Sequence, residues 1–91
     1  MAQETIEQFN AANAENRRHM AAETQLRNEA RQLRSDQLQG LVACQGAGVA
    51  AACRNGLEQH IQQRGLMLDN RARNERDAHR ANLQTIGVNP Y

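Results

Sequence analysis

Large apolar side chains are scarce in this sequence of 91 residues. It has no tryptophan, one phenylalanine and one tyrosine, and isoleucine, leucine, valine and phenylalanine together number 15. That share lies below the roughly 20% at which a chain struggles to build its own hydrophobic core. The net charge of only +1 does not add the charge repulsion typical of disordered chains. We therefore expect the chain to become ordered by association.

Proline is almost absent, and lysine is absent altogether. The only proline is Pro90, while alanine, glutamine, asparagine and arginine account for 46 residues, half of the chain. Alanine, glutamine and arginine are good helix formers, and nothing before Pro90 forbids a helix. We predict an all-α fold of two long helices in a single unit, residues 1–86, that is ordered by oligomerisation or docking.

Composition divides this helical unit into three zones. Two polar arms at 2–39 and 57–86 flank a centre of small apolar residues at 40–56. Gly87 followed by Pro90 predicts a helix stop, so we expect residues 87–91 to form an extended tail.

A break between the two helices is predicted first at Asn55-Gly56, because glycine readily takes the left-handed conformation that ends many helices. Gly46 and Gly48 offer a second position for the break. A break would give a hairpin, whereas its absence would give one nearly continuous helix, and the residues leave both arrangements open.

Both arms carry narrow stripes at helical spacing, which favour packing against other helices. In the first arm a stripe of Ile6, Phe9, Asn13, Asn16 and Met20 leads into Ala22, Leu26, Ala30 and Leu33, and Leu41 and Cys44 continue it. The stripe of the second arm is Leu57, Ile61, Leu68, Ala72, Glu75, His79, Asn82 and Ile86. Its polar part predicts a face toward water, a pore or a polar partner. Within the same arm, Glu75 is spaced to pair with His79 or Arg71 one helical turn away.

Small residues recur every four positions in the centre of the chain. One row is Gly40, Cys44, Gly48, Ala52 and Gly56, and a second row is Ala43, Ala47 and Ala51. Rows of small residues let a neighbouring backbone approach closely. We predict a helix-packing interface composed of Gly40, Cys44, Ala47, Gly48, Ala52 and Gly56, together with Leu26, Leu33 and Leu41 of the stripe.

The two cysteines, Cys44 and Cys53, are about half a helical turn out of phase, so within one helix they cannot form a disulfide. Neither has the neighbours of a zinc site. We expect both to be small buried thiols. The acidic N-terminal segment carries no secretory signal pattern, and we accordingly expect a reducing compartment.

The sequence carries no recognisable catalytic, metal-binding or nucleotide-binding motif, so we expect neither enzymatic activity nor a cofactor. The histidines lack metal-ligand spacing, and the string GAGVAA lacks the glycine and acidic residue of a dinucleotide-binding loop. The 14-residue segment from Gly40 to Cys53 is short for a single membrane span, which needs about 20 residues; membrane contact is expected only for an oligomer. Weak nucleic-acid contact would draw on Arg64, Arg71, Arg73, Arg76 and Arg80.

The chain resembles the small internal virion, or DNA-ejection, proteins of short-tailed bacteriophages. The resemblance lies in the helical segment FNAANAENRRHMAAETQLRNEARQLR, the patch GLVACQGAGVAAAC and the arm DNRARNERDAHRANLQTIG. It implies a multicopy structural protein of the virion, made in the host cytoplasm, that assembles into part of a conduit for genome delivery.

Three functional hypotheses follow from these observations. The first is a structural helical protein that self-associates within a larger assembly, alongside other structural proteins of a phage particle. The alternatives are a small helical adaptor or regulator in the cytoplasm that binds a single partner protein, and a nucleic-acid-associated helical protein.

In the tail, Val88 and Tyr91 are interpreted as a docking peptide, because Tyr91 combines an aromatic face and a hydroxyl.

Overall fold

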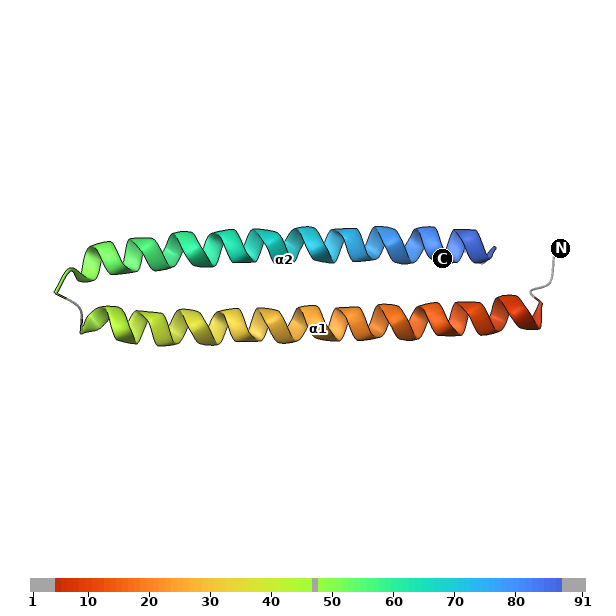
Figure 1. Ribbon diagram of the computed structural model, residues 1–91, viewed down its shortest axis with the longest axis horizontal. Coiled ribbons are helices and arrows are strands. Elements are labelled where there is room, and N and C mark those ends of the chain that lie inside the picture. The colour runs from red at the N-terminus through yellow and green to blue at the C-terminus, as the bar shows by residue number, and fades with distance from the viewer. Residues whose placement is uncertain (1–4, 47, 88–91) are drawn as a thin grey trace.

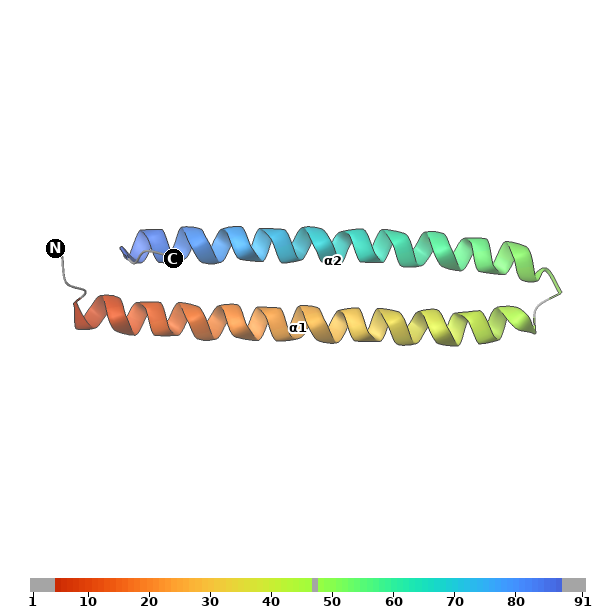
Figure 2. The same ribbon diagram turned by 180° about the vertical axis from the view of Figure 1, so that it is seen from behind.

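The computed structural model describes residues 5–46 and 48–87, which form an antiparallel hairpin of two long helices. Helix α1 spans Ile6–Gln45 and helix α2 spans Ala50–Ile86, and they lie side by side along their whole length (Figure 1). The reverse view shows the same single layer (Figure 2). The predicted all-α fold of two helices is confirmed, and of the two arrangements left open the chain adopts the hairpin.

Helix α1 begins with a reciprocal cap that its sequence encodes. The Thr5 hydroxyl accepts from the Gln8 amide N–H at 3.0 Å, and the Gln8 side-chain oxygen accepts from the Thr5 N–H at 2.9 Å. This capping box satisfies backbone donors that have no partner within the helix. The Gln8 side-chain nitrogen also donates to the carbonyl of Ile86 at 3.2 Å. Gln8 therefore joins the start of α1 to the end of α2.

Helix α2 ends at Gly87, as predicted. Gly87 has a φ of 94°, and its N–H donates to the carbonyls of Leu83 and Gln84, both at 3.1 Å. Left-handed backbone at this position favours glycine. A Cβ at Gly87 would also lie 2.8 Å from the side-chain nitrogen of Gln8. The backbone conformation therefore favours glycine here, and a larger residue would also displace the Gln8 side chain.

The turn between the helices lies at the second predicted position. Helix α1 ends at Gln45 with Gly46 as its C-cap, and α2 starts after Val49. The prediction of a break at Asn55-Gly56 is wrong: both residues lie inside α2 and are exposed. Glycine in a helix interior costs only about 1 kcal/mol relative to alanine, and packing along the rest of α2 outweighs that cost.

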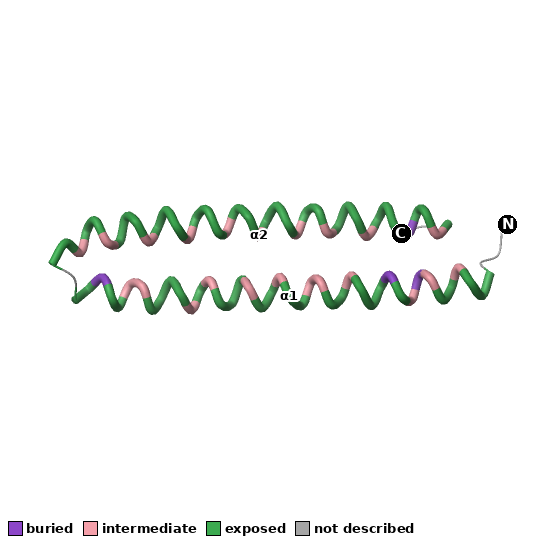
Figure 3. Tube along the Cα trace, viewed as in Figure 1, coloured by how far each residue is buried: buried purple, intermediate pink, exposed green. Residues whose placement is uncertain are grey.

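The half-buried and buried residues lie along one narrow seam, where each helix faces the other, and the residues on the outer sides of the helices are exposed (Figure 3). On α2 most of the predicted stripe lies in the seam and is half-buried, at Leu57, Ile61, Leu68, Ala72, Glu75, His79 and Ile86. Asn82 is exposed instead, and the buried residue beside it, Leu83, was not predicted. On α1 the later part of the predicted stripe, including Leu26 and Leu33, also lies in the seam, except for Ala30, which is exposed. Its earlier part is wrong. Ile6, Phe9 and Met20 are 81%, 56% and 66% exposed, and the contact face of this part of α1 contains Ala12, Glu15 and His19 instead.

The hairpin is far from globular. Its principal extents are 69 × 15 × 14 Å and its radius of gyration is 20.0 Å, whereas a globular chain of this length has a radius of about 12 Å. Among the described residues only Ala12, Glu15, Cys44 and Leu83 are buried. Neither described helix is long and apolar enough to cross a lipid bilayer.

Candidate functional site

The most distinctive site is a polar cluster between the helices near the open end of the hairpin. It comprises six side chains, three from each helix: Glu15, Arg18, His19, Glu75, His79 and Asn82. The sequence predicted that Glu75, His79 and Asn82 share a polar face. Their polar partner is the other helix of the same chain.

Glu15 is the most buried member, with a side chain only 7% exposed. It accepts two hydrogen bonds from Arg18, at 2.8 Å each, one from His79 Nδ1 at 2.7 Å and one from Asn82 Nδ2 at 2.8 Å. Hydrogen bonds to the ionised carboxylate, that from Arg18 first, lower the pKa of Glu15 from 4.5 to about 2 against the opposing effect of burial. Glu15 therefore remains a carboxylate at neutral pH and holds groups from both helices.

Arg18 links the two carboxylates of the cluster. Its guanidinium binds Glu15 on its own helix and also donates to Glu75 on α2, with Nη2 to Oε2 at 2.9 Å. This contact with Arg18, followed by that with His19, lowers the pKa of Glu75. The same two carboxylates raise the pKa of Arg18. One cation thus bridges two anions across the helix interface, in the fork geometry that suits arginine.

His19 and His79 stack on each other across the interface. Their ring centroids are 3.9 Å apart and their planes differ by 5°. On the α1 side, His19 lies 3.0 Å from Glu23 through Nε2 and 3.5 Å from Glu75 through Nδ1. The side chains of His19 and His79 are 16% and 20% exposed. Each imidazole therefore lies between a ring of the other helix and at least one carboxylate.

A second interhelical ion pair lies nearer the middle of the hairpin. Arg71 Nη1 is 2.8 Å from Glu29 Oε2, but this buried oxygen has no hydrogen bond of acceptable geometry, so the contact is electrostatic. The pairing predicted within the second arm is therefore wrong. Arg71 binds Glu29 and Glu75 binds Arg18, because the polar face of α2 is turned toward α1.

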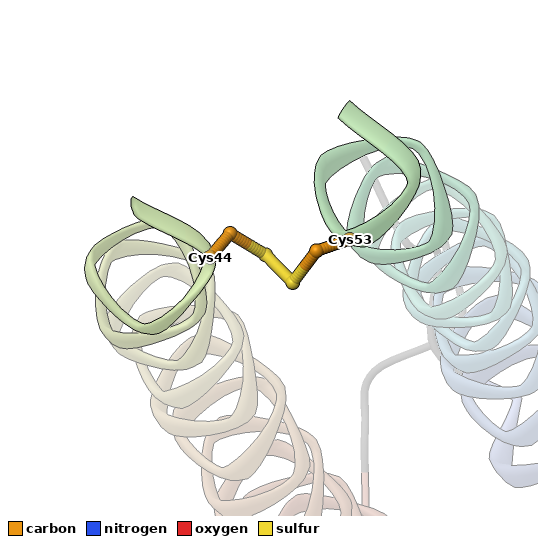
Figure 4. The surroundings of a disulfide bond; sticks show 2 residues. All are labelled: Cys44 and Cys53. Atoms are coloured by element: carbon orange, nitrogen blue, oxygen red, sulfur yellow. A yellow bond between two sulfur atoms is a disulfide. The ribbon is translucent and has the colours of Figure 1, made fainter. Parts of the chain in front are cut away.

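At the turn, Cys44 and Cys53 form a disulfide, with Cα atoms 5.5 Å apart (Figure 4). The expectation of two free thiols is wrong. The phase argument applied to a single helix, whereas here one cysteine lies on α1 and the other on α2. The hairpin turn brings them within bridging distance. The expectation that they are buried is correct for Cys44, which is 2% exposed, while Cys53 is half-buried.

The hairpin separates the predicted helix-packing interface into two groups. Five of its members lie in the seam: Leu26, Leu33, Gly40, Leu41 and Cys44. A Cβ at Gly40 would lie 2.7 Å from Leu57 Cδ1, so α2 comes close to the backbone at this point. In contrast, Gly48, Ala52 and Gly56 are exposed. The turn interrupts the predicted row, which no longer forms one continuous face.

Three predicted positions lie outside the described residues: Ala47, and Val88 and Tyr91 of the tail. Sequence reasoning also missed Glu15, Arg18 and His19. The signal for Glu15 and His19 was present in the alternating spacing of 4 and 3 residues that runs from Glu15 through His19, Ala22, Leu26, Glu29 and Leu33, whereas Arg18 lies outside this spacing. This spacing is the heptad pattern of paired helices. It was missed because several of its members are polar, whereas the predicted stripe followed large apolar residues.

The polar cluster joins the two helices to each other. Each of its carboxylates accepts hydrogen bonds from a guanidinium, an amide or an imidazole. Within residues 5–46 and 48–87, no group of three or more His, Cys, Asp or Glu side chains is arranged to hold a metal ion.

No protein-family model, curated protein or solved structure matches the chain.

Proposed function

We propose that this chain is a non-enzymatic structural protein whose hairpin self-associates with further copies within a larger assembly. The observation that carries the proposal is the surface that the hairpin leaves exposed. Its accessible area is 7175 Å², whereas a compact monomer of 10.2 kDa exposes about 5,300 Å². The excess of about 1,900 Å² exceeds the total of about 1,600 Å² that a standard protein interface buries.

The exposed area includes an apolar stripe along the outside of α1. The outer stripe consists of Ile6, Phe9, Met20, Leu38 and Val42, whose exposed fractions are 81%, 56%, 66%, 61% and 67%. At 100° per residue, the five positions fall within about 60° of one another around the α1 axis. Between Met20 and Leu38 the same side carries exposed Thr24, Arg27 and Arg31, so the outer stripe is apolar toward the two ends of α1. Exposed apolar side chains in such a row favour contact with another protein surface.

A second copy of the hairpin is the occupant that we propose for the outer stripe. The helices of one copy bury too little apolar area to form a core, and a second hairpin laid along α1 would cover the stripe over its full length. On the resemblance to DNA-ejection proteins alone, we extend the proposal to a component of a phage virion involved in genome delivery. We expect membrane contact only of the oligomer.

Light scattering coupled to size-exclusion chromatography tests the proposal. The wild-type chain should elute with a mass that is a multiple of 10.2 kDa. The double variant Leu38→Glu, Val42→Glu should shift to the monomer mass, because two carboxylates would then be buried in an apolar contact. The matched control is Gln59→Glu, Gln63→Glu, which adds the same charges at the same spacing on exposed positions of α2.

Two outcomes would overturn the proposal. A wild-type chain that stays monomeric at tens of micromolar concentration would favour the adaptor hypothesis, in which the hairpin binds a single different partner. An equal loss of mass in the charge variant and in its control would show that the outer stripe is not the contact surface. The small-residue positions offer a further comparison, because Ala52→Leu adds bulk to an exposed site and therefore affects only contacts between copies.

A further inference from the structure

The arginines and the carboxylates in the middle of α1 lie on different sides of the helix. Residues 15–36 contain five arginines and four acidic residues, so the sequence of this stretch is nearly neutral. Glu15 and Glu29, however, are turned toward α2, where they contact His79 and Arg71. The contacts between the helices thus draw negative charge to the seam and leave positive charge on the outer side of α1.

The basic row consists of Arg27, Arg31 and Arg34, three exposed arginines on this outer side. They fall within about 60° of one another around the helix axis, and the first and last are about 10 Å apart along it. The Arg27 side chain is 68% exposed and lies 3.6 Å from Glu23. Arg31 and Arg34 have no ion pair or hydrogen bond in the part of the chain that the structure describes. The row therefore presents guanidinium groups that the hairpin itself does not neutralise.

A row of guanidinium groups suits a ligand with regularly repeated phosphates. Arginine binds phosphate through paired N–H donors in a fork geometry. Phosphates on one strand of duplex DNA follow each other every 3.4 Å or so along its axis, so the length of the row matches about three of them. The chain has no aromatic residue between Phe9 and Tyr91, whereas sites for single strands use aromatic side chains to stack bases. The row thus fits the backbone of a duplex.

The arginines of α2 form no comparable surface. Arg71 is bound to Glu29, and Arg73 donates to Asn70 at 3.4 Å. The same helix exposes the carboxylates Asp69 and Asp77 among its arginines. Nucleic-acid contact, which the sequence assigned to this arm, therefore has a better-suited surface on α1.

A second copy of the hairpin would enlarge the basic surface; this copy is that of the proposed function, on which this step rests. A hairpin that covers the apolar ends of the outer stripe brings its own arginines into the same contact region. Repulsion between the two sets of arginines opposes the contact. A bound polyanion removes that repulsion, so binding of the polyanion and pairing of the copies promote each other. A lipid surface, in contrast, would need the apolar ends uncovered.

We propose that the basic row of Arg27, Arg31 and Arg34 binds the phosphate backbone of double-stranded DNA without sequence preference, and that a second copy of the hairpin completes the site. The apolar ends of the outer stripe hold the copies together, and the arginines between these ends hold the duplex.

Fluorescence anisotropy with a short labelled DNA duplex tests the basic row in the full chain. The triple variant Arg27→Gln, Arg31→Gln, Arg34→Gln should bind the duplex about tenfold more weakly than the wild-type chain, or weaker still. The slope of log affinity against log salt concentration should become shallower by about 2.7 for each copy bound, since each lost phosphate contact removes about 0.9. A duplex of different sequence should give the same affinities.

The matched control is Arg54→Gln, Arg64→Gln, Arg76→Gln, which removes the same charge from exposed positions of α2 and should keep the wild-type affinity and slope. Equal weakening in both triple variants would overturn the proposal, as would a wild-type chain that does not bind the duplex at low salt. Equally tight binding of polyglutamate, which is anionic but has no phosphate, would show attraction to any polyanion and overturn it. Binding to anionic lipid vesicles but not to the duplex would assign the row to a membrane surface instead.

Light scattering separates this site from the proposed function. Without DNA, the row variant should associate at least as strongly as the wild-type chain, because it keeps the apolar ends and lacks the repulsion. Added duplex should increase the mass of the wild-type assembly. A row variant that falls to the monomer mass would overturn the arrangement of the two copies. A wild-type chain that binds the duplex through the row but stays monomeric would overturn the second-copy step together with the proposed function, and would confirm the row as a site within one copy.

Discussion

The two ends of the hairpin are closed by different chemistry. At the turn, a covalent bond joins Cys44 to Cys53 among alanines and glycines. At the open end, hydrogen bonds and charges join Glu15, Arg18 and Glu75. The closure at the turn does not depend on proton concentration, whereas that at the open end consists of groups that titrate.

This difference shows how a chain with little apolar area holds two long helices together. A narrow seam of leucines in the middle does not fix the ends, where helices fray. Each end therefore has a specific fastening, and the two fastenings respond to different conditions. Reduction should release one end, and acid should release the other.

Removal of the disulfide should have the largest effect. The double variant Cys44→Ser, Cys53→Ser frees a short loop in the unfolded chain, and loop-closure entropy predicts a loss of about 2–3 kcal/mol in the free energy of unfolding. Thermal unfolding followed by circular dichroism measures it. A reductant should lower the midpoint of the wild-type chain to that of the variant and leave the variant unchanged. Equal midpoints for both proteins without reductant would contradict the comparison.

Removal of the central carboxylate should weaken the open end by about 2 kcal/mol. Glu15→Gln leaves the side-chain shape almost unchanged but removes the charge that binds Arg18 and His79. Urea unfolding at neutral pH measures the change in the free energy of unfolding. The control is Glu58→Gln, at an exposed position of α2, which should unfold like the wild-type chain. Equal losses in both variants would mean that the cluster contributes nothing specific.

Acid should loosen the open end of the hairpin because it protonates Glu15. The pKa of Glu15 falls from 4.5 to about 2 on folding, so the unfolded chain takes up the proton first. The stability contributed by this carboxylate is present above about pH 4.5 and is lost as the pH falls toward 2. Unfolding curves over this range should show the loss in the wild-type chain and a smaller pH dependence in Glu15→Gln. Parallel pH profiles for the two proteins would argue against ionised Glu15 as the fastening group.

Glycine substitutions should have the smallest effects, and their sign should depend on position. Gly87→Ala should lower the free energy of unfolding by about 1 kcal/mol, because alanine is strained at a positive φ and its Cβ would approach Gln8. Gly56→Ala should raise it by up to about 1 kcal/mol, because Gly56 lies inside α2 with open space around it. Chemical denaturation of both variants measures the pair. A stabilising Gly87→Ala would contradict the role of Gly87 as a helix end.

The sequence predicted the two helices and much of their contact surface, and the errors in the predicted stripes have physical causes. The content of alanine, glutamine and arginine predicted the helices. The α2 stripe was correct at Leu57, Ile61 and Leu68, but it missed the buried Leu83. The early α1 stripe was wrong because large apolar residues were assumed to face inward. Ile6, Phe9 and Met20 face outward instead, and the seam near them contains buried Ala12 and Leu83 together with the polar cluster.

The sequence predicted the α2 half of the polar cluster but not its α1 half. The polar face of α2 followed from the spacing of Glu75, His79 and Asn82, but its partner depended on the register of the hairpin. That register depends on the turn, and Asn55-Gly56 has a stronger turn signal than Gly46. With the turn at Gly46, the phase argument against a disulfide disappears, and Cys44 faces Cys53.

The double role of Gln8 makes the lengths of the two helices interdependent. One side chain caps α1 and also binds the last carbonyl of α2, while the disulfide fixes the opposite ends together. The molecule therefore acts as a closed frame in which neither long side can change alone. A one-residue deletion in one arm would rotate everything beyond it by about 100° and break the register. Paired deletions of whole heptads, one from each arm, are the changes in length that such a frame can accommodate.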